Sequence, residues 1–180
     1  MKKRYLKKNM MLTSAIIVLV FIAQPKLWSL IAGGIIVLAG ELIRVWATGH
    51  LKRNPEVTTS GPYAYLRDPL YLGRLFLLIG FCVMAWGYGL FLFLPAGLCV
   101  FAYSYMPRKY KKEMARLEKY FGEEYVAYAA YCRSLIPRLN PYAKSDNRKW
   151  SASLFWYENR EQYFILMVVS IFVAIIFRLR

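Results

Sequence analysis

Few side chains in this sequence of 180 residues could carry the common catalytic chemistries. His50 is the single histidine, which excludes a histidine-rich metal site and leaves a Ser-His-Asp triad without support. The three cysteines, Cys82, Cys99 and Cys132, form no C-x-x-C pair, so neither a disulfide framework nor a zinc knuckle is predicted. The glycine fingerprints of Rossmann and P-loop nucleotide sites do not occur. Any cofactor must therefore be bound in another way.

Glu41 and Arg44 form a pair of opposite charges at the end of an apolar run. They lie one helical turn apart and can therefore pair on one face of a helix. Ionisable residues at membrane depth indicate a functional site. The alternative is an interfacial ion pair that closes the hydrocarbon region.

The composition indicates which class of protein must position these side chains. Hydrophobic residues make up 58% of the chain, aromatic residues 17%, and the mean hydropathy is +0.32. An ordinary soluble domain is less apolar. There are 25 Lys and Arg against 10 Asp and Glu, a net charge of +15. The long uncharged runs argue against a basic nucleic-acid binder. We therefore predict an integral membrane protein with basic cytoplasmic segments.

The apolar runs predict an all-α, polytopic helical membrane protein that forms one domain over residues 1–180. About five transmembrane helices are expected, at 10–23, 27–46, 70–86, 90–105 and 163–177. Gly33, Gly34 and Gly40 in the second run would let a neighbouring helix approach closely, and Pro95 predicts a kink in the fourth. The basic start resembles a signal peptide without a cleavage site, so we expect an uncleaved anchor.

Two polar segments, 48–69 and 108–160, separate the apolar runs. The first is rich in turn-forming residues and predicts a substantial loop. In the second, apolar residues recur every three or four positions, at Met114, Leu117, Phe121, Tyr125 and Tyr128. This spacing predicts an amphipathic helix, interrupted at Gly122, that lies against the bilayer surface.

The distribution of Lys and Arg predicts a cytoplasmic N-terminus and an external C-terminus. In this orientation, all of the 25 Lys and Arg except Lys26, Arg178 and Arg180 are cytoplasmic, and both polar segments face the cytosol. The compact length favours a prokaryotic source, and hence the inner (plasma) membrane.

Two stretches are more specific, and together they resemble a known family. Residues 49–73 read GHLKRNPEVTTSGPYAYLRDPLYLG, and residues 113–137 read EMARLEKYFGEEYVAYAAYCRSLIP. The chain resembles the membrane methyltransferases of the isoprenylcysteine carboxyl methyltransferase and phospholipid N-methyltransferase type over roughly residues 41–141. That family has a T-S-G-x-Y-x-x-x-R-H-P-x-Y-x-G segment and a transmembrane hairpin. A glutamate-rich helix start, F-G-x-x-Y-x-x-Y and I-P follow.

The resemblance implies methyl transfer from S-adenosylmethionine to a lipid-like or isoprenylated acceptor, a carboxylate or an amine. It places the cofactor between the hairpin and the cytoplasmic C-terminal segment, with a tunnel open to membrane lipids, and implies no nucleic-acid partner. The implied cofactor contacts are Val57, Thr58, Tyr63, Asp68, Pro69, Leu70, Tyr71 and Glu113. The implied catalytic residues are Arg67, Asp68 and Lys109.

These residue types suit a cationic cofactor. The Glu113 carboxylate can hold its ammonium group, and tyrosine rings offer π faces to its sulfonium methyl. Transfer is an in-line displacement, so positioning of the acceptor dominates. A carboxylate acceptor needs no base, whereas an amine must lose a proton, which makes Asp68 or Glu113 relevant.

Three positions depart from the family pattern. The R-H-P motif reads Arg67-Asp68-Pro69, the paired glutamates read Glu113-Met114, and Lys109 replaces an arginine that could grip a carboxylate in bidentate fashion. The prediction of a carboxylate acceptor therefore has less support from the residues than the prediction of the cofactor.

Two other functions stay open. One is a non-catalytic lipid- or partner-binding protein of the same fold, and the other is a relative of the NADPH-dependent sterol reductases. Individual residues also have plainer interpretations. Glu113 could be a solvated helix charge, Arg67 could extend to the interface, and Tyr63, Tyr65 and Tyr71 could form an interfacial aromatic belt.

Overall fold

The computed structural model describes residues 2–52 and 56–179, without the side chains of residues 2–9, 104–105 and 108–112. The described residues contain no strand, which confirms the all-α prediction. The α-helices are α1 (Lys2–Ile22), α2 (Leu27–Thr48), α3 (Pro69–Ala85), α4 (Leu94–Cys99), α5 (Met106–Tyr131) and α6 (Glu161–Ile176). Shorter turns are the 3-10 helix η1 (Gly61–Ala64) and the π-helical η2 (Gly89–Phe93), η3 (Val100–Tyr105) and η4 (Leu154–Glu158).

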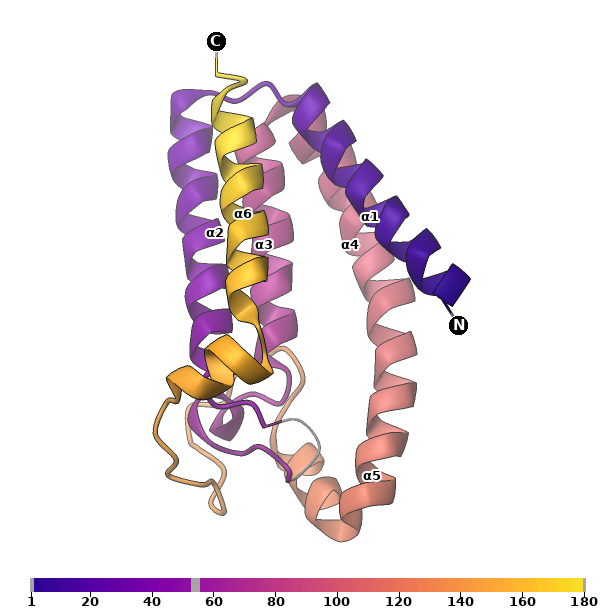
Figure 1. Cartoon of the computed structure of the whole chain (residues 1–180), viewed down its shortest axis with the longest axis vertical. Helices are drawn as coiled ribbons and strands as arrows, with labels where there is room; N and C mark the ends of the chain where they lie inside the picture. The colour runs from indigo at the N-terminus through magenta and orange to yellow at the C-terminus, as the bar shows by residue number, and fades with distance from the viewer. Residues whose placement is uncertain (1, 53–55, 180) are drawn as a thin grey trace.

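The helices form a bundle and an arm (Figure 1). Helices α2, α3 and α6 stand side by side, while α4 and α5 follow one another as a long arm with α1 beside its upper part. The α1–α2 connection and the C-terminus lie at one end of the bundle. The loop after α2 and the chain between α5 and α6 lie at the other end. The two predicted polar segments therefore meet at one end of the molecule.

Glycines let α2 and α3 pack with their backbones in close approach. A Cβ atom on Gly33 would lie 2.6 Å from the Gly80 carbonyl oxygen, and one on Gly40 would lie 2.9 Å from the Gly73 carbonyl oxygen. A Cβ on Gly34 would lie 3.3 Å from the Phe172 ring of α6. The predicted role of all three α2 glycines is confirmed, because small residues allow such contact.

A buried ion cluster joins α2 to α6. Arg44 and Glu161 are 2% and 5% exposed and form a salt bridge. Arg44 Nε also lies 3.9 Å from Glu41 Oε2, which confirms the predicted pair one turn apart. The Arg44 guanidinium stacks 3.6 Å from the ring centroid of Phe164. The partner Glu161 is 117 residues away in sequence, and sequence reasoning did not identify it.

Among the described helices, α2 is long and apolar enough to cross a membrane by length and composition. The other apolar stretches are shorter, at Met10–Ile22, Pro69–Ala85, Gly89–Tyr103 and Glu161–Ile176. Five spans are therefore not confirmed, although each predicted run overlaps an apolar helix. Helical geometry continues through Pro95, and the kink predicted there stays a prediction. The π-helical η2 and η3 flank this position and accommodate a residue that lacks an N–H donor.

The second polar segment begins as a helix that continues the arm. Helix α5 starts at Met106, directly after η3, and bends at Gly122, where φ is 52° and ψ is −130°. The predicted interruption at Gly122 is confirmed. The apolar face was predicted to lie against the bilayer, but it packs on the protein. Met114, Leu117 and Phe121 join the buried cluster of Tyr125, Tyr128 and Cys132, together with Val57 and Tyr142.

Candidate functional site

A cavity of about 500 Å³ lies between α3, α5 and the loop that follows α2. Nine of the ten positions named by the sequence line it: Val57, Thr58, Tyr63, Arg67, Asp68, Pro69, Leu70, Tyr71 and Glu113. Asp68 was named both as a cofactor contact and as a catalytic residue. The Lys109 side chain is outside the described part of the chain. The remaining lining residues are Leu51, Lys52, Glu56, Arg74, Met106, Met114, Arg116, Leu117, Tyr125 and Tyr128.

Backbone hydrogen bonds join the loop that carries Tyr63 and Arg67 to the segment that follows α5. The Arg67 backbone N–H donates to the Arg133 carbonyl oxygen at 2.9 Å, and the Asp68 N–H donates to Ser134 at 3.2 Å. In return, the Arg138 N–H donates to the Tyr65 carbonyl at 3.0 Å. The I-P end of the second stretch thus holds the first stretch in place. Backbone pairing explains why two distant segments can form one site.

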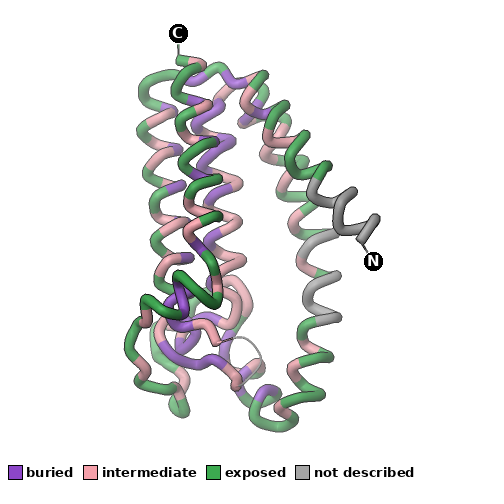
Figure 2. Tube along the Cα trace, viewed as in Figure 1, coloured by how far each residue is buried: buried purple, intermediate pink, exposed green. Residues whose placement is uncertain are grey.

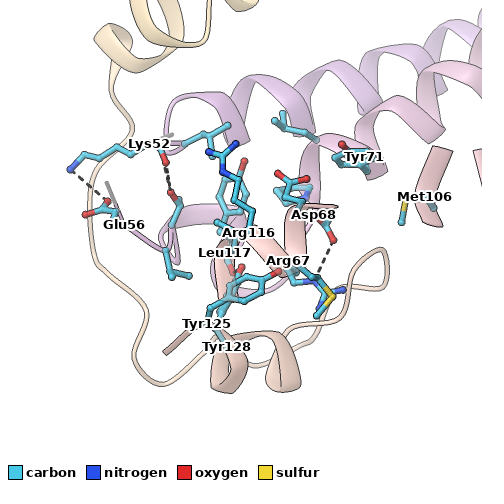
Figure 3. Close-up of a pocket in the computed structure, with 18 of the residues that line it drawn as sticks. Lys52, Glu56, Arg67, Asp68, Tyr71, Met106, Arg116, Leu117, Tyr125 and Tyr128 are labelled. Atoms are coloured by element: carbon cyan, nitrogen blue, oxygen red, sulfur yellow. Dashed lines mark hydrogen bonds and ion pairs between the residues drawn. The ribbon is translucent and has the colours of Figure 1, made fainter. Parts of the chain in front are cut away.

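Asp68 sits at the joint between these two segments. Its Oδ2 accepts a hydrogen bond from Ser134 Oγ at 2.7 Å and lies 3.3 Å from Arg67 Nε. The Arg67 side chain also donates from Nη1 to the Ala129 carbonyl at 3.4 Å. Asp68 precedes Pro69, which starts α3 with a residue suited to the first helical turn. Asp68 therefore has a structural role in addition to lining the cavity (Figure 3).

Tyr125 and Tyr128 of α5 also line the cavity. Tyr128 is 3% exposed, and its hydroxyl donates to the Tyr63 carbonyl at 2.8 Å. Burial raises the pKa of the Tyr128 hydroxyl, so it stays a neutral donor. Burial likewise raises the pKa of the neighbouring Cys132 thiol to about 11, which opposes a nucleophilic role. The helical spacing placed Tyr125 and Tyr128 on one apolar face of the helix, but it did not predict that they line the cavity.

Arg148, which does not line the cavity, contacts the described residues of the loop after α2. Arg148 forms a salt bridge with Glu56, donates to the His50 carbonyl at 2.7 Å and lies 3.1 Å from Ser60 Oγ. The Arg148 hydrogen bond lowers the pKa of the Glu56 carboxyl. Nothing in the local sequence indicated that Arg148 reaches back 98 residues to this loop. Because Glu56 lines the cavity, Arg148 helps to place the cavity wall.

His50 is buried beside the Ser60-Gly61-Pro62 turn. It is 5% exposed, and its Nδ1 lies 3.2 Å from Ser60 Oγ. Burial and the nearby Arg148 lower the pKa of His50. Gly61 adopts φ +58°, and a Cβ there would lie 2.4 Å from the His50 ring. The Ser60-Gly61-Pro62 turn therefore depends on glycine.

The cavity combines both signs of charge with aromatic faces. Glu56, Asp68 and Glu113 supply carboxylates, and its cations come from Lys52, Arg67, Arg74 and Arg116. Tyr63, Tyr71, Tyr125 and Tyr128 add aromatic rings. A volume of about 500 Å³ is that of a small-molecule or cofactor pocket. This donor set fits a ligand that carries both cationic and anionic groups, as S-adenosylmethionine does.

Comparisons with known proteins add no assignment. No family model, curated protein or solved structure matches the chain.

Proposed function

We propose that the chain is an integral membrane methyltransferase that uses S-adenosylmethionine and acts on a lipid-like acceptor. One observation carries the proposal. Nine of the positions implied by the family resemblance come from the loop after α2, the start of α3 and α5, and they line one cavity. Such a cavity with convergent polar groups is the usual form of a small-molecule site. The resemblance supplies the reaction, and the cavity supports it.

When bound, S-adenosylmethionine supplies a sulfonium methyl group, which the acceptor atom takes up as the methyl–sulfur bond breaks. Glu113 is suited to bind the ammonium group of the cofactor through a charge-assisted hydrogen bond. The rings of Tyr63 and Tyr71 present faces that attract a cationic sulfonium. Arg67 and Tyr128 keep the loop and α5 together. The chain then contributes mainly by positioning, which is the main requirement of a displacement at carbon.

The membrane setting is part of the proposal. Helix α2 and the four shorter apolar helices would form five spans, some of them shorter than a lone span requires. The cavity lies at the end of the bundle where the two basic polar segments meet, and the positive-inside rule places that end in the cytosol. The inner membrane of a prokaryote is the proposed location.

Binding of the cofactor tests the proposal. We expect calorimetry in detergent to detect S-adenosylmethionine binding to the unmodified chain. Glu113→Gln should weaken binding about ten-fold or more, because it removes a charged hydrogen-bond partner. Glu118→Gln is the matched control, since Glu118 is exposed on the same helix and does not line the cavity. Equal dissociation constants for both variants and the unmodified chain would assign Glu113 to the solvated surface.

A second candidate function is a non-catalytic lipid-binding protein of this fold. Asp68 favours it, because its carboxylate replaces the family histidine and forms contacts with Ser134 and Arg67. Tritiated-methyl transfer into extracted membrane lipids separates the two functions. We expect Asp68→His to keep cofactor binding and to raise turnover, because a carboxylate stabilises the cationic ground state more than the transition state. Absence of both transfer and cofactor binding would favour the non-catalytic protein.

Cysteine labelling tests the orientation. In a Cys99→Ser background, single cysteines at positions 3, 52 and 144 should all label from the cytoplasmic side. Cys82 and Cys132 are buried and give little background. External labelling at position 144 would overturn the shared cytoplasmic site.

A further inference from the structure

Arg74 is the only charged residue of the otherwise apolar helix α3. It lies five residues after Pro69, where the helix begins. A charge within an apolar helix is costly in a membrane and is kept mainly where it meets a partner, a ligand or water. Neither the family pattern nor the helical spacing assigned Arg74 a role. Its position therefore needs a separate explanation.

Arg74 lines the cavity beside Tyr71. Its guanidinium carbon lies 5.3 Å from the centroid of the Tyr71 ring, one helical turn earlier. In the close-up, Tyr71 and Met106 lie toward one end of the cavity, and Lys52 and Glu56 lie toward the other (Figure 3). The contact with Tyr71 places Arg74 near the end bordered by α3 and Met106. That end is the side of the apolar helices.

The other cations of the lining come from the loop after α2 and from α5. Lys52 Nζ lies 3.6 Å from Glu56 Oε1, and Arg67 Nε lies 3.3 Å from Asp68 Oδ2. Arg116 is exposed on α5, and its guanidinium carbon lies 6.0 Å from the centroid of the Tyr120 ring, which is outside the lining. Arg74 is thus the cation that the apolar helix α3 brings to the cavity.

We propose that Arg74 binds an anionic group, a phosphate or a carboxylate, on the lipid-like ligand of this cavity. A guanidinium presents a planar fork of donors that matches either anion in bidentate fashion. The Tyr71 ring under it restricts the guanidinium plane. The apolar side chains of α3 would then contact the lipid tail. The inference rests on the proposed function for the role of the ligand as acceptor, while the binding site itself can be tested without turnover.

The experiment measures lipid binding without the methyl donor. The purified chain in detergent micelles is titrated with fluorescent phosphatidic acid, a fluorescent fatty acid and a fluorescent diacylglycerol. We expect at least one anionic probe to bind about ten-fold tighter than the neutral diacylglycerol. Preference for the phosphate or for the carboxylate identifies the source of the anion. Arg74→Gln should abolish the preference, and Arg74→Lys should retain part of it because the charge remains.

The matched control is Arg138→Gln. The Arg138 guanidinium carbon also lies over a tyrosine ring, 4.4 Å from the Tyr131 centroid, but neither residue lines the cavity. This variant should bind all three probes as the unmodified chain does. Equal binding of the three probes to the unmodified chain would overturn the proposal. Loss of the anionic preference in Arg138→Gln as well as in Arg74→Gln would also overturn it.

Two further measurements keep the inference separate from folding and from the methyltransferase proposal. Photo-crosslinkable phosphatidic acid and fatty acid, each with the reactive group near its anionic end, should label α3 or Met106 in the unmodified chain. Labelling confined to other segments would contradict the site. Calorimetry with S-adenosylmethionine on the unmodified chain tests the methyltransferase proposal by itself. An anionic preference that depends on Arg74, in a chain that does not bind S-adenosylmethionine, would support this site and reject the methyltransferase function.

Discussion

The two walls of the cavity are built in contrasting ways. On one side, α3 packs against α2 through paired glycines, and the adjoining loop is held by backbone hydrogen bonds to residues 133 and 134. On the other side, the described side chains of α5 before Gly122 are largely exposed and only partly covered at Met114, Leu117 and Phe121 (Figure 2). After the bend, the buried Tyr125 and Tyr128 anchor the helix.

This contrast suggests a division of labour within the proposed enzyme. The bundle wall carries most of the implied cofactor contacts, which need a fixed geometry for positioning. The arm wall carries Glu113, Met114, Arg116 and Leu117. The predictions below test whether the bundle wall governs stability while the arm wall governs ligand binding.

The largest effect is expected from Arg44→Met in the bundle. The change leaves Glu161 and Glu41 as buried carboxylates without their cation, which costs about 3–5 kcal/mol. Thermal unfolding in detergent should show a large drop in midpoint. The double variant Arg44→Met/Glu161→Met should recover part of the loss, since a buried pair replaced by apolar residues is often tolerated. Equal losses in the single and double variants would mean that packing of Arg44, and not charge, dominates.

Gly33→Ala is expected to come next, with a loss of about 1–3 kcal/mol from overpacking. Its added methyl would meet the Gly80 carbonyl oxygen and the Met84 backbone nitrogen, each at 2.6 Å, and backbone atoms cannot turn aside. The neighbouring variant Gly34→Ala meets only the Phe172 ring at 3.3 Å. We expect a much smaller change in unfolding midpoint for Gly34→Ala. Similar midpoints for the two variants would contradict the close α2–α3 contact.

Gly122→Ala tests the arm. Alanine rarely adopts φ 52° and ψ −130°, so the change costs on the order of 1 kcal/mol or straightens the helix. No heavy atom lies within 4 Å of the added methyl, so strain and not a clash is the cause. We expect weaker ligand binding with little change in the unfolding midpoint. Ala127→Gly, at an exposed position beyond the bend, is the control and should leave ligand binding unchanged.

The smallest effect concerns pH and His50. Because burial lowers the folded-state pKa of His50, the neutral form stabilises the fold. This contribution is complete above the ordinary pKa of 6.5 and is lost as the pH falls below it. The unfolding midpoint should therefore fall slightly between pH 7.5 and 5.5. His50→Asn should flatten this dependence. Glu56 adds nothing in this window, because its pKa is lowered from 4.5.

Much of the bundle could be predicted from local pattern. The apolar runs predicted helices whose ends differ from α2 and α3 by one or two residues. The glycines of α2 predicted close approach, and Gly122 predicted the bend in α5. These features depend on residues near one another in the chain, and so their signals are visible in the sequence.

The partners across the fold could not be predicted in the same way. The contacts Arg44–Glu161, Arg148–Glu56 and Asp68–Ser134 join residues from 66 to 117 positions apart. A charged residue in a polar segment has many possible partners, and only the path of the chain selects one. The surface against which the apolar face of α5 packs was predicted wrongly for a similar reason. An apolar stripe on α5 could face a bilayer or a protein surface with the same spacing.

The sequence by itself determined the all-helical class, the order of apolar and basic segments, and the residues that a family resemblance could name. Those properties follow from side-chain chemistry and short-range periodicity. Only the tertiary structure decided that the loop after α2, the start of α3 and both sides of the Gly122 bend enclose one cavity, and that Arg74 borders it. Enclosure depends on how α3 and α5 are separated in space, and that separation is set by packing between segments far apart in the chain.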